Sequence, residues 1–399
     1  MKKLNLIFIP YQDTDNYYAD GILTREYAML YIIAQLGIDD VINIKKPRSW
    51  LDKRRYSINE YYYPEGTIEY DVKRICENAT TIQYNCIFSL GQIIRRRGWW
   101  IDGYKRIERR LMEELKKQLY IVYSDNPYAV ELLKMLKGEG CYIYFDVMDN
   151  FAIHPSLHSE ERECALKSYT DIMRFADIVS ANSLQTCDYM EQKTGRRPVL
   201  IKNGVFPNNE IANSKSIECI SSIREQKKGY RKCVGYIGKL GLRIDADLID
   251  KLSDGCKDVL FVIVGPYLKG QFSKKLMNLI QNKKNIVHIE GIPSAYVYSV
   301  LDEFDILMIP HATGKAENGG DPLKLYQYMT RRKPIITTPI LGVDEFSDYI
   351  TISDDPNEWI EFINGSGNIK KSSIPETINW FNRFEPISME IKAWIKSHS

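Results

Sequence analysis

Short apolar runs alternate with amphipathic stretches along most of the chain. Runs typical of buried strands occupy Leu4–Pro10, Ile121–Ser124, Cys141–Asp146, Ile178–Asn182 and Pro198–Lys202. Stretches with helical periodicity lie between them, at Thr24–Leu36, Gly103–Leu119, Ala129–Lys137 and Glu160–Phe175. This alternation predicts βαβ units and a parallel sheet with helices on both faces.

The pattern stops near Asn203 and then resumes. Residues 211–232 are polar and weakly periodic, so we interpret them as a linker. Six further strands are predicted at Cys233–Ile237, Leu260–Val264, Ile286–Ile289, Ile306–Ile309, Pro334–Thr337 and Tyr349–Ile352. The fold class is therefore α/β, with Rossmann-like domains at 1–210 and 233–376 facing a central cleft. The helical segment 377–399, expected to break at Pro386, packs back on the N-terminal domain.

Composition narrows the function classes. The 399 residues include 54 Lys and Arg against 52 Asp and Glu, a net charge of +2, which argues against nucleic acid as a partner. The eight cysteines form no C-x-x-C pair and the five histidines do not cluster with them, which argues against a structural zinc site. No apolar run approaches the roughly 18 residues of a membrane span. We expect a cytoplasmic protein with reduced thiols, either soluble or peripheral to a membrane.

The most informative segment is residues 319–329, Gly-Gly-Asp-Pro-Leu-Lys-Leu-Tyr-Gln-Tyr-Met. Asp321 fits an N-cap and Pro322 the first position of a helix, and the two preceding glycines let a ligand approach the backbone. The free amides of such a helix attract a phosphate, and Lys324 adds a full charge in the first turn. Gln327 shares a face with Lys324. The alternative is a capped surface helix with an incidental lysine.

This segment resembles the Pro-Leu-Lys-Leu-Phe-Glu-Tyr signature of GT-B glycosyltransferases that build bacterial surface polysaccharides. Other pieces are similar to that family in the same order, over roughly residues 120–340. They are Tyr-Phe-Asp-Val-Met-Asp at 144–149, Ala-Asp-Ile-Val-Ser-Ala-Asn-Ser at 176–183, Ile-Lys-Asn-Gly-Val at 201–205, Gly-Tyr-Ile-Gly-Lys-Leu-Gly-Leu-Arg at 235–243, Phe-Val-Ile-Val-Gly-Pro at 261–266, Val-His-Ile-Glu-Gly at 287–291, Phe-Asp-Ile-Leu-Met-Ile-Pro at 304–310 and Lys-Pro-Ile-Ile-Thr-Thr at 333–338.

The resemblance implies a nucleotide-sugar donor held by the C-terminal domain. The base would lie against the backbone at Gly291, Ile292 and Pro293, and the ribose would lie against Gln327. The diphosphate would lie beside Lys324, in the same segment as Asp321 and Leu325. The phosphate side would be lined by Gly238, Lys239 and Arg243. Most relatives carry Glu where this chain has Gln327, and an amide still offers a donor and an acceptor to a sugar diol. The Lys-x-x-Gln spacing is similar to that of the xanthan-type glucuronosyltransferase, which favours a UDP-sugar.

Acidic residues follow a predicted strand of the N-terminal domain. Asp149 matches the family's second acidic position and is the candidate base that would deprotonate an acceptor hydroxyl if the reaction inverts configuration. In a retaining reaction it would only bind substrate, and its alternative role is a cap or turn residue. Asp146 and His154 are candidates for contact with the acceptor or the sugar, although an exposed loop histidine would look the same.

The stretch Ile93–Ile101 combines three arginines with two tryptophans. Arg95, Arg96, Arg97, Trp99 and Trp100 suit an anionic membrane surface, where a lipid-linked acceptor would be found. The alternative is a partly buried aromatic pair beneath solvated arginines.

Taken together, these features predict a glycosyltransferase that moves a sugar from a nucleotide-sugar, with UDP favoured, to a glycan or lipid-linked acceptor. No metal and no cofactor is expected, because the Asp-x-Asp at Asp245 and Asp247 fits the first turn of a helix. Two alternatives stay open: a sugar-nucleotide epimerase of the same fold, and a non-catalytic protein that binds a sugar or nucleotide.

Overall fold

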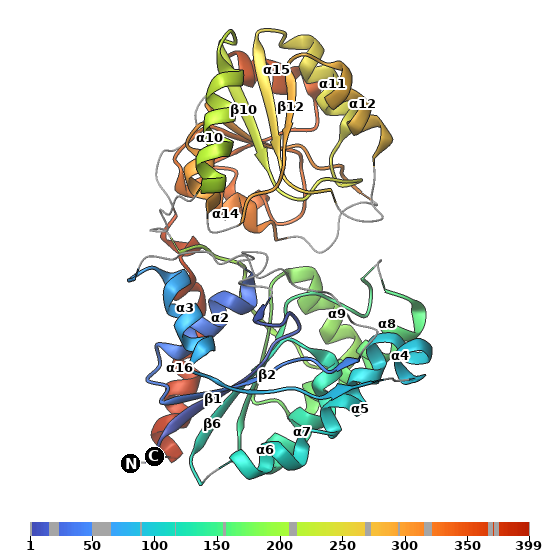
Figure 1. The fold of residues 1–399 in the computed structure, drawn as a ribbon, viewed down its shortest axis with the longest axis vertical. Coiled ribbons are helices and arrows are strands. Elements are labelled where there is room, and N and C mark those ends of the chain that lie inside the picture. The colour runs from blue at the N-terminus through green and yellow to red at the C-terminus, as the bar shows by residue number, and fades with distance from the viewer. Residues whose placement is uncertain are drawn as a thin grey trace. The chain divides into compact units, whose positions relative to one another are not determined.

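The computed structural model describes residues 2–15, 24–49, 65–87, 90–115, 117–154, 157–206, 214–267, 273–293, 296–314, 321–365, 370 and 375–398. The chain divides into two compact units (Figure 1). Unit 1 comprises Met1–Lys202 and Trp380–Ser399, and unit 2 comprises Asn203–Asn379.

Unit 1 is built on a parallel seven-stranded sheet in the order β4-β2-β1-β6-β7-β8-β9. Its strands are β1 (Leu4–Ile9), β2 (Asp40–Ile44), β4 (Thr80–Ile82), β6 (Leu119–Ser124), β7 (Tyr142–Val147), β8 (Ile178–Ala181) and β9 (Val199–Leu200), and a separate pair joins β3 (Arg48–Ser49) to β5 (Asn85–Cys86). β1, β6 and β7 are buried along their whole length, as expected of central strands covered on both faces.

Helices cover both faces of this sheet. They are α2 (Arg25–Ala34), α3 (Ile68–Glu77), α4 (Leu90–Arg95), α5 (Trp100–Lys105), α6 (Glu108–Glu114), α7 (Val130–Gly138), α8 (Ser159–Phe175), α9 (Leu184–Thr194) and α16 (Trp380–His398), with 3-10 turns η2 (Arg96–Trp99) and η3 (Pro127–Ala129). Ile7 and Ile9 of β1 face the core shared with α7 and α8. Phe8 points to the other face and stacks on Tyr123 at 5.4 Å.

The C-terminal helix α16 belongs to unit 1, as the sequence predicts, but it is not broken at Pro386. Helix α16 runs through that residue. Its buried side chains Phe384, Ile387 and Ile391 account for the continuity, because their packing outweighs one lost backbone hydrogen bond. Phe384 lies 6.0 Å from the ring of Tyr144 in β7, and α16 packs on α2.

Unit 2 repeats the architecture with a parallel six-stranded sheet in the order β12-β11-β10-β13-β14-β15. Its elements are α10 (Ser214–Lys227), β10 (Lys232–Ile237), α11 (Ala246–Gly255), β11 (Val259–Val264), α12 (Lys274–Asn282), β12 (Ile286–Ile289), α13 (Val297–Leu301), β13 (Ile306–Ile309), α14 (Leu323–Thr330), β14 (Ile335–Thr337), η5 (Asp344–Phe346), β15 (Thr351–Ile352), α15 (Pro356–Asn364) and η6 (Glu376–Ile378). Alternate residues of β10 supply two cores: Cys233 and Ile237 face α13 and α14, whereas Val234 and Tyr236 face α11.

The predicted linker at 211–232 differs most from the structure. Of its described residues, 214–227 form α10, which packs on α13 within unit 2, and Lys232 begins β10. Cys219 and Ile223 are buried in the core there, whereas most of the helix surface is polar. Two buried apolar side chains give a weak periodic signal, which explains why the sequence suggested a connection rather than a helix.

The fold class predicted from the sequence, α/β with two Rossmann-like domains, is confirmed. Among the described helices, none has the length and apolar character that crossing a membrane requires.

Candidate functional site

Two glycine turns shape the carboxyl edge of the sheet in unit 2. Gly238 follows β10 with φ +155°, and Gly265 follows β11 with φ +148°. A Cβ on Gly265 would meet the Gly238 carbonyl oxygen at 1.9 Å, so only glycine fits there. A Cβ on Gly238 would lie 2.7 Å from the Lys324 ammonium nitrogen. The bare backbone at Gly238 therefore leaves the space that this ammonium group occupies.

Helix α14 is held against the end of β10 by a buried phenol. The β10–β13 ladder stops at Gly235, and the Ile237 backbone N–H donates instead to the Tyr328 hydroxyl at 2.7 Å. Tyr328 is fully buried, so this bond replaces the pairing with β13 that β10 lacks at its carboxyl end. The first turn of α14, with Lys324, is thereby fixed beside the turn after β10.

The Lys324 ammonium has two uncharged partners. It lies 2.6 Å from the Tyr236 hydroxyl, 3.0 Å from His311 Nε2 and 4.3 Å from the centre of the Tyr236 ring. The Tyr236 hydroxyl can in turn donate to the Lys239 carbonyl oxygen, 3.2 Å away. An ammonium carries three hydrogens, so one is left for a ligand. Within the described part of the chain, no carboxylate pairs with Lys324.

Further positive charge surrounds this lysine. Burial, and then the charge of Arg243, lower the pKa of Lys324 well below its ordinary value. Burial, followed by the charges of Lys324 and Arg243, likewise lowers the pKa of His311. The Nε atom of Arg243 is buried without a hydrogen-bond partner among the described residues. Lys324 and Arg243 are thus two cations that disfavour each other's charge. A bound phosphate would supply the negative charge that compensates them.

The structure corrects the role of Asp321. Helix α14 begins one residue later than expected, and Pro322 rather than Asp321 stands at its N-cap. The Asp321 carboxylate instead accepts hydrogen bonds from the Asn203 backbone N–H and the Tyr326 hydroxyl. It therefore ties the first segment of unit 2 to α14. Gly319 and Gly320 lie outside the described residues.

The other residues predicted to bind the donor differ in how far they are buried. Leu325 is fully buried in the core, so its side chain supports α14 and does not face a ligand. Lys239 is exposed and Gln327 is half-buried. At the end of β12, a Cβ on Gly291 would lie 2.6 Å from the Pro266 ring, and the next two residues, Ile292 and Pro293, are half-buried and buried.

In unit 1, Asp146 is enclosed rather than available to a sugar. It is fully buried at the end of β7 and forms an ion pair with Arg25 at 2.6 Å. Ser180 donates to its second oxygen at 2.6 Å, and the Tyr123 hydroxyl lies 3.4 Å away. A carboxylate occupied on both oxygens positions its neighbours, so the sugar contact expected of Asp146 is not supported.

Asp149 is placed differently, in an exposed turn just past β7. The Tyr169 hydroxyl donates to its carbonyl oxygen at 2.9 Å, which holds the turn in place. Burial lowers the pKa of the half-buried His154, and the negative charge of Asp149 opposes that shift. The structure thus brings Asp149 and His154 into one electrostatic pair.

A buried carboxyl pair lies at the same edge of unit 1. Glu26 and Asp125 are 0% and 2% exposed. Their oxygens Glu26 Oε2 and Asp125 Oδ2 have no donor among the described residues, and the two groups lie close enough to share a proton. Burial, together with the neighbouring carboxyl, raises the pKa of Asp125 well above its ordinary value, and burial raises that of Glu26. This pair was not identified from the sequence.

The basic-aromatic stretch is largely occupied by contacts within unit 1. Trp99 is 3% exposed, and the Trp100 ring lies 5.7 Å from the rings of both Tyr11 and Tyr128. The burial of Trp99 therefore leaves it unavailable to a membrane surface, whereas Trp100 is half-buried and its membrane contact stays a prediction. Arg97 pairs with Glu161 at 3.0 Å and Arg95 pairs with Asp102, whereas Arg96 is exposed.

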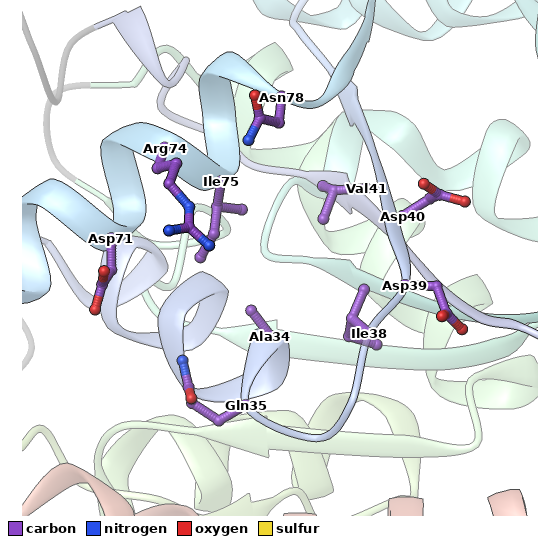
Figure 2. A pocket seen from close by; sticks show the side chains of 10 residues that line it. All are labelled: Ala34, Gln35, Ile38, Asp39, Asp40, Val41, Asp71, Arg74, Ile75 and Asn78. Atoms are coloured by element: carbon purple, nitrogen blue, oxygen red, sulfur yellow. The ribbon is translucent and has the colours of Figure 1, made fainter.

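A pocket of 450 Å³ opens at the amino end of β2, the opposite edge of the sheet from Asp149. It is lined by Ala34, Gln35, Ile38, Asp39, Asp40, Val41, Asp71, Arg74, Ile75 and Asn78. Figure 2 shows the Arg74 side chain reaching into the space above Ala34, while Asp39 and Asp40 point away. Those two carboxylates bind the Leu4 N–H and Lys3. The pocket therefore offers little convergent chemistry to a ligand.

Solved structures of similar fold span the whole chain. HepE of Anabaena, crystallised with UDP, is 16% identical, covers 98% of this chain and 100% of its own, and has a TM-score of 0.62. The trehalose 6-phosphate synthase of Burkholderia multivorans is 11% identical with full coverage of both chains and a TM-score of 0.61. The lipopolysaccharide outer core galactosyltransferase WaaB is 12% identical, covers 97% of this chain and 99% of its own, and has a TM-score of 0.56.

These likenesses establish the fold. No protein-family model and no curated protein matches the sequence. At such low identities, the role of any residue must come from its own surroundings.

The sequence missed His311 and Tyr236 as well as the carboxyl pair. A positional signal existed for the first two: Tyr236 lies near the carboxyl end of β10, and His311 follows β13, its neighbour in the sheet. Ligands of parallel α/β sheets bind at this edge, so a histidine just past such a strand was a candidate. Glu26 gave no comparable signal, because only the folded chain brings it to Asp125.

Proposed function

We propose that the protein is a glycosyltransferase that uses a nucleotide-diphosphate sugar, with the donor bound in unit 2 and the acceptor bound at the carboxyl edge of unit 1. The observation that carries this proposal is a cluster of two cations, Lys324 and Arg243, beside the neutral His311. Burial and the charge of Arg243 lower the pKa of Lys324, and no described carboxylate pairs with its ammonium group. A diphosphate is the anion that best relieves such a cluster beside a glycine turn.

Lys324 would bind and stabilise the diphosphate as it leaves the sugar. Its ammonium has one hydrogen directed at neither Tyr236 nor His311. Negative charge grows on the leaving diphosphate during transfer, so a fixed cation there binds the transition state more tightly than the ground state. Because Gly238 has no side chain, the Lys324 ammonium can lie against the turn after β10, where the phosphate would bind. Gln327 and residues 291–293 keep their proposed contacts with the ribose and the base.

Asp149 is the proposed base in unit 1. It is exposed and lies beside His154, whereas Asp146 is sealed behind Arg25. A carboxylate in that position can accept the proton of an acceptor hydroxyl as the oxygen attacks the anomeric carbon. His154 would orient the acceptor or share its proton. No metal or cofactor forms part of the proposal.

The finer points of the proposal concern the donor and the product. HepE has been crystallised with UDP and with UDP-glucose, and WaaB is a lipopolysaccharide galactosyltransferase. Together with the signature at 322–328, these names favour a UDP-sugar donor and a glycan or lipid-linked acceptor of the cell surface.

Thermal unfolding with a panel of ligands tests the proposal. We would compare UDP, GDP, dTDP, CMP, their common sugar conjugates and inorganic pyrophosphate. A nucleotide at a hundred times its Kd stabilises the native state by about 2.7 kcal/mol, which raises the unfolding midpoint by roughly 5–10 °C for a domain of this size. A selective rise with one nucleoside diphosphate supports the donor site and names the base. No shift with any nucleotide, or the same shift with pyrophosphate alone, contradicts it.

A further inference from the structure

Helix α4 and Ile87, which precedes it, expose an unusual group of apolar side chains. Ile87, Leu90, Ile93 and Ile94 are 86%, 64%, 59% and 70% exposed, and α4 itself has no buried residue. Single exposed apolar residues are ordinary on protein surfaces, but four within eight positions form a patch that requires an explanation. We call these four residues the α4 patch.

The patch is presented by a well-anchored segment. η2 follows α4 and packs on α8 (Figure 1), with Trp99 3% exposed and Arg97 paired with Glu161 at 3.0 Å. Arg96 has φ +50°, a left-handed conformation that ends α4. At the other side, the Ser49 hydroxyl bonds to Gln92. Contacts on both flanks hold α4 in place, and its isoleucines still face outward.

Among the described residues, one unpaired positive charge lies beside the patch. Residues 95–97 are three consecutive arginines. Arg97 is neutralised by Glu161 and Arg95 by Asp102, whereas exposed Arg96 forms no ion pair within the described part of the chain. The apolar patch therefore lies next to arginines that an anionic surface would attract.

We propose that the α4 patch docks the protein on an anionic lipid surface, with the isoleucines inserted among the acyl chains and Arg95 and Arg96 among the headgroups. A membrane accepts a short convex helix, because lipids close around inserted side chains. A protein partner fits less well. Three aliphatic side chains on a six-residue helix, with Ile87 before it, offer less than the roughly 800 Å² that each partner contributes to a stable interface. The proposal does not depend on the proposed catalysis.

Cosedimentation with lipid vesicles tests this docking. The probes are vesicles of phosphatidylcholine alone, and vesicles in which about a third of the lipid is phosphatidylglycerol. The full chain should bind the anionic vesicles and lose most of that binding at high salt. The double variant Ile93→Ser with Ile94→Ser should bind them roughly tenfold more weakly, because two large apolar side chains no longer enter the bilayer. Arg96→Gln should weaken binding less.

A matched double variant controls for general loss of surface hydrophobicity. Ile217 and Met389 are 55% and 60% exposed on other helices, so Ile217→Ser with Met389→Ser should bind like the parent. Equal thermal midpoints of both double variants would show that each is folded. The proposal is overturned if the parent ignores both kinds of vesicle, if both double variants bind equally, or if the parent self-associates through the patch and the α4 variant alone is monomeric.

Discussion

The two units share an architecture but carry opposite charge at the carboxyl edges of their sheets. In unit 2 this edge holds the cations Lys324 and Arg243 beside the neutral His311, and no described carboxylate pairs with Lys324. In unit 1 it holds the carboxyl pair of Glu26 and Asp125 and the exposed Asp149. The difference shows how one fold can supply both halves of a transfer reaction: a cationic edge suits a phosphate, and an acidic edge suits a hydroxyl that must lose its proton.

The units also differ in how they compensate their buried charges. In unit 1, Arg25 neutralises Asp146 through an ion pair at 2.6 Å. A proton shared between Glu26 and Asp125 can remove one negative charge from that pair. Unit 2 gives Lys324 only the neutral partners Tyr236 and His311. A complete internal network contributes to a stable structure, whereas an incomplete one is typical of a binding site without its ligand.

The largest expected effect comes from Asp149→Asn, which distinguishes the role of the edge in unit 1 from the role of the edge in unit 2. We expect transfer to fall by at least about 100-fold, because the amide cannot accept the proton of the acceptor. UDP affinity should not change, because the substitution lies in unit 1. The measurement is product formation alongside calorimetric UDP binding. Asp171→Asn, at an exposed position on α8, serves as the control, and transfer at the parental rate in Asp149→Asn would remove that residue from the mechanism.

The next effect is on stability, from Arg25→Met. This substitution leaves Asp146 as a buried carboxylate without its cation, since the Arg25 and Asp146 side chains are 2% and 0% exposed. Loss of one partner of a buried pair costs about 3–5 kcal/mol. Arg224→Met, which removes a pair with Glu303 where the arginine is 68% exposed, should cost far less, because water screens an exposed pair. Urea unfolding measures both values, and equal values would contradict the structural role given to Asp146.

Glu26→Gln should stabilise the protein at neutral pH. Burial raises the pKa of Glu26, so the folded state holds a proton that the unfolded chain releases above its ordinary pKa of about 4.3. Stability from this pair is therefore present at acidic pH and is lost as the pH rises. The amide removes that loss, so the variant should be more stable than the parent at pH 8 and should not differ from it near pH 4. Thermal scans at both pH values, with Glu113→Gln as the exposed control, test the sign. Destabilisation at pH 8 would contradict the carboxyl pair.

The smallest expected effect is proton uptake when UDP binds. The pKa of Lys324 is lowered in the free protein, and a bound diphosphate would raise it. At a pH between the pKa of Lys324 in the free protein and its higher pKa in the UDP complex, binding should therefore take up a fraction of a proton. UDP affinity should fall as the pH rises through that range. Calorimetry in two buffers of different ionisation enthalpy measures the uptake. Proton release on binding would contradict the assignment.

The sequence predicted the central strands well and the sites only in part. Buried parallel strands such as residues 259–264 are continuous apolar runs, so their positions can be predicted from the sequence alone. Helix α10 was missed because only Cys219 and Ile223 mark its buried side. Pro386 was misjudged because local propensity took no account of the packing around Phe384.

For the sites, the sequence supplied residues but not their partners. Lys324 was identified from its signature, yet its contacts with Tyr236 and His311 join segments 88 and 13 positions apart. Asp146 and Asp149 looked alike in the sequence, and only Arg25, 121 positions away, distinguishes the buried one. Residues brought together by folding leave no local pattern to detect.

Calorimetric titration of UDP into the parent and into Lys324→Ala tests the central claim most directly. Lys228→Ala, at an exposed lysine on the surface of unit 2, controls for the general loss of one positive charge. We predict that the parent and Lys228→Ala bind UDP alike and that Lys324→Ala shows no measurable binding while its thermal midpoint stays close to that of the parent. Unchanged UDP affinity in Lys324→Ala would contradict the account of a diphosphate site in unit 2.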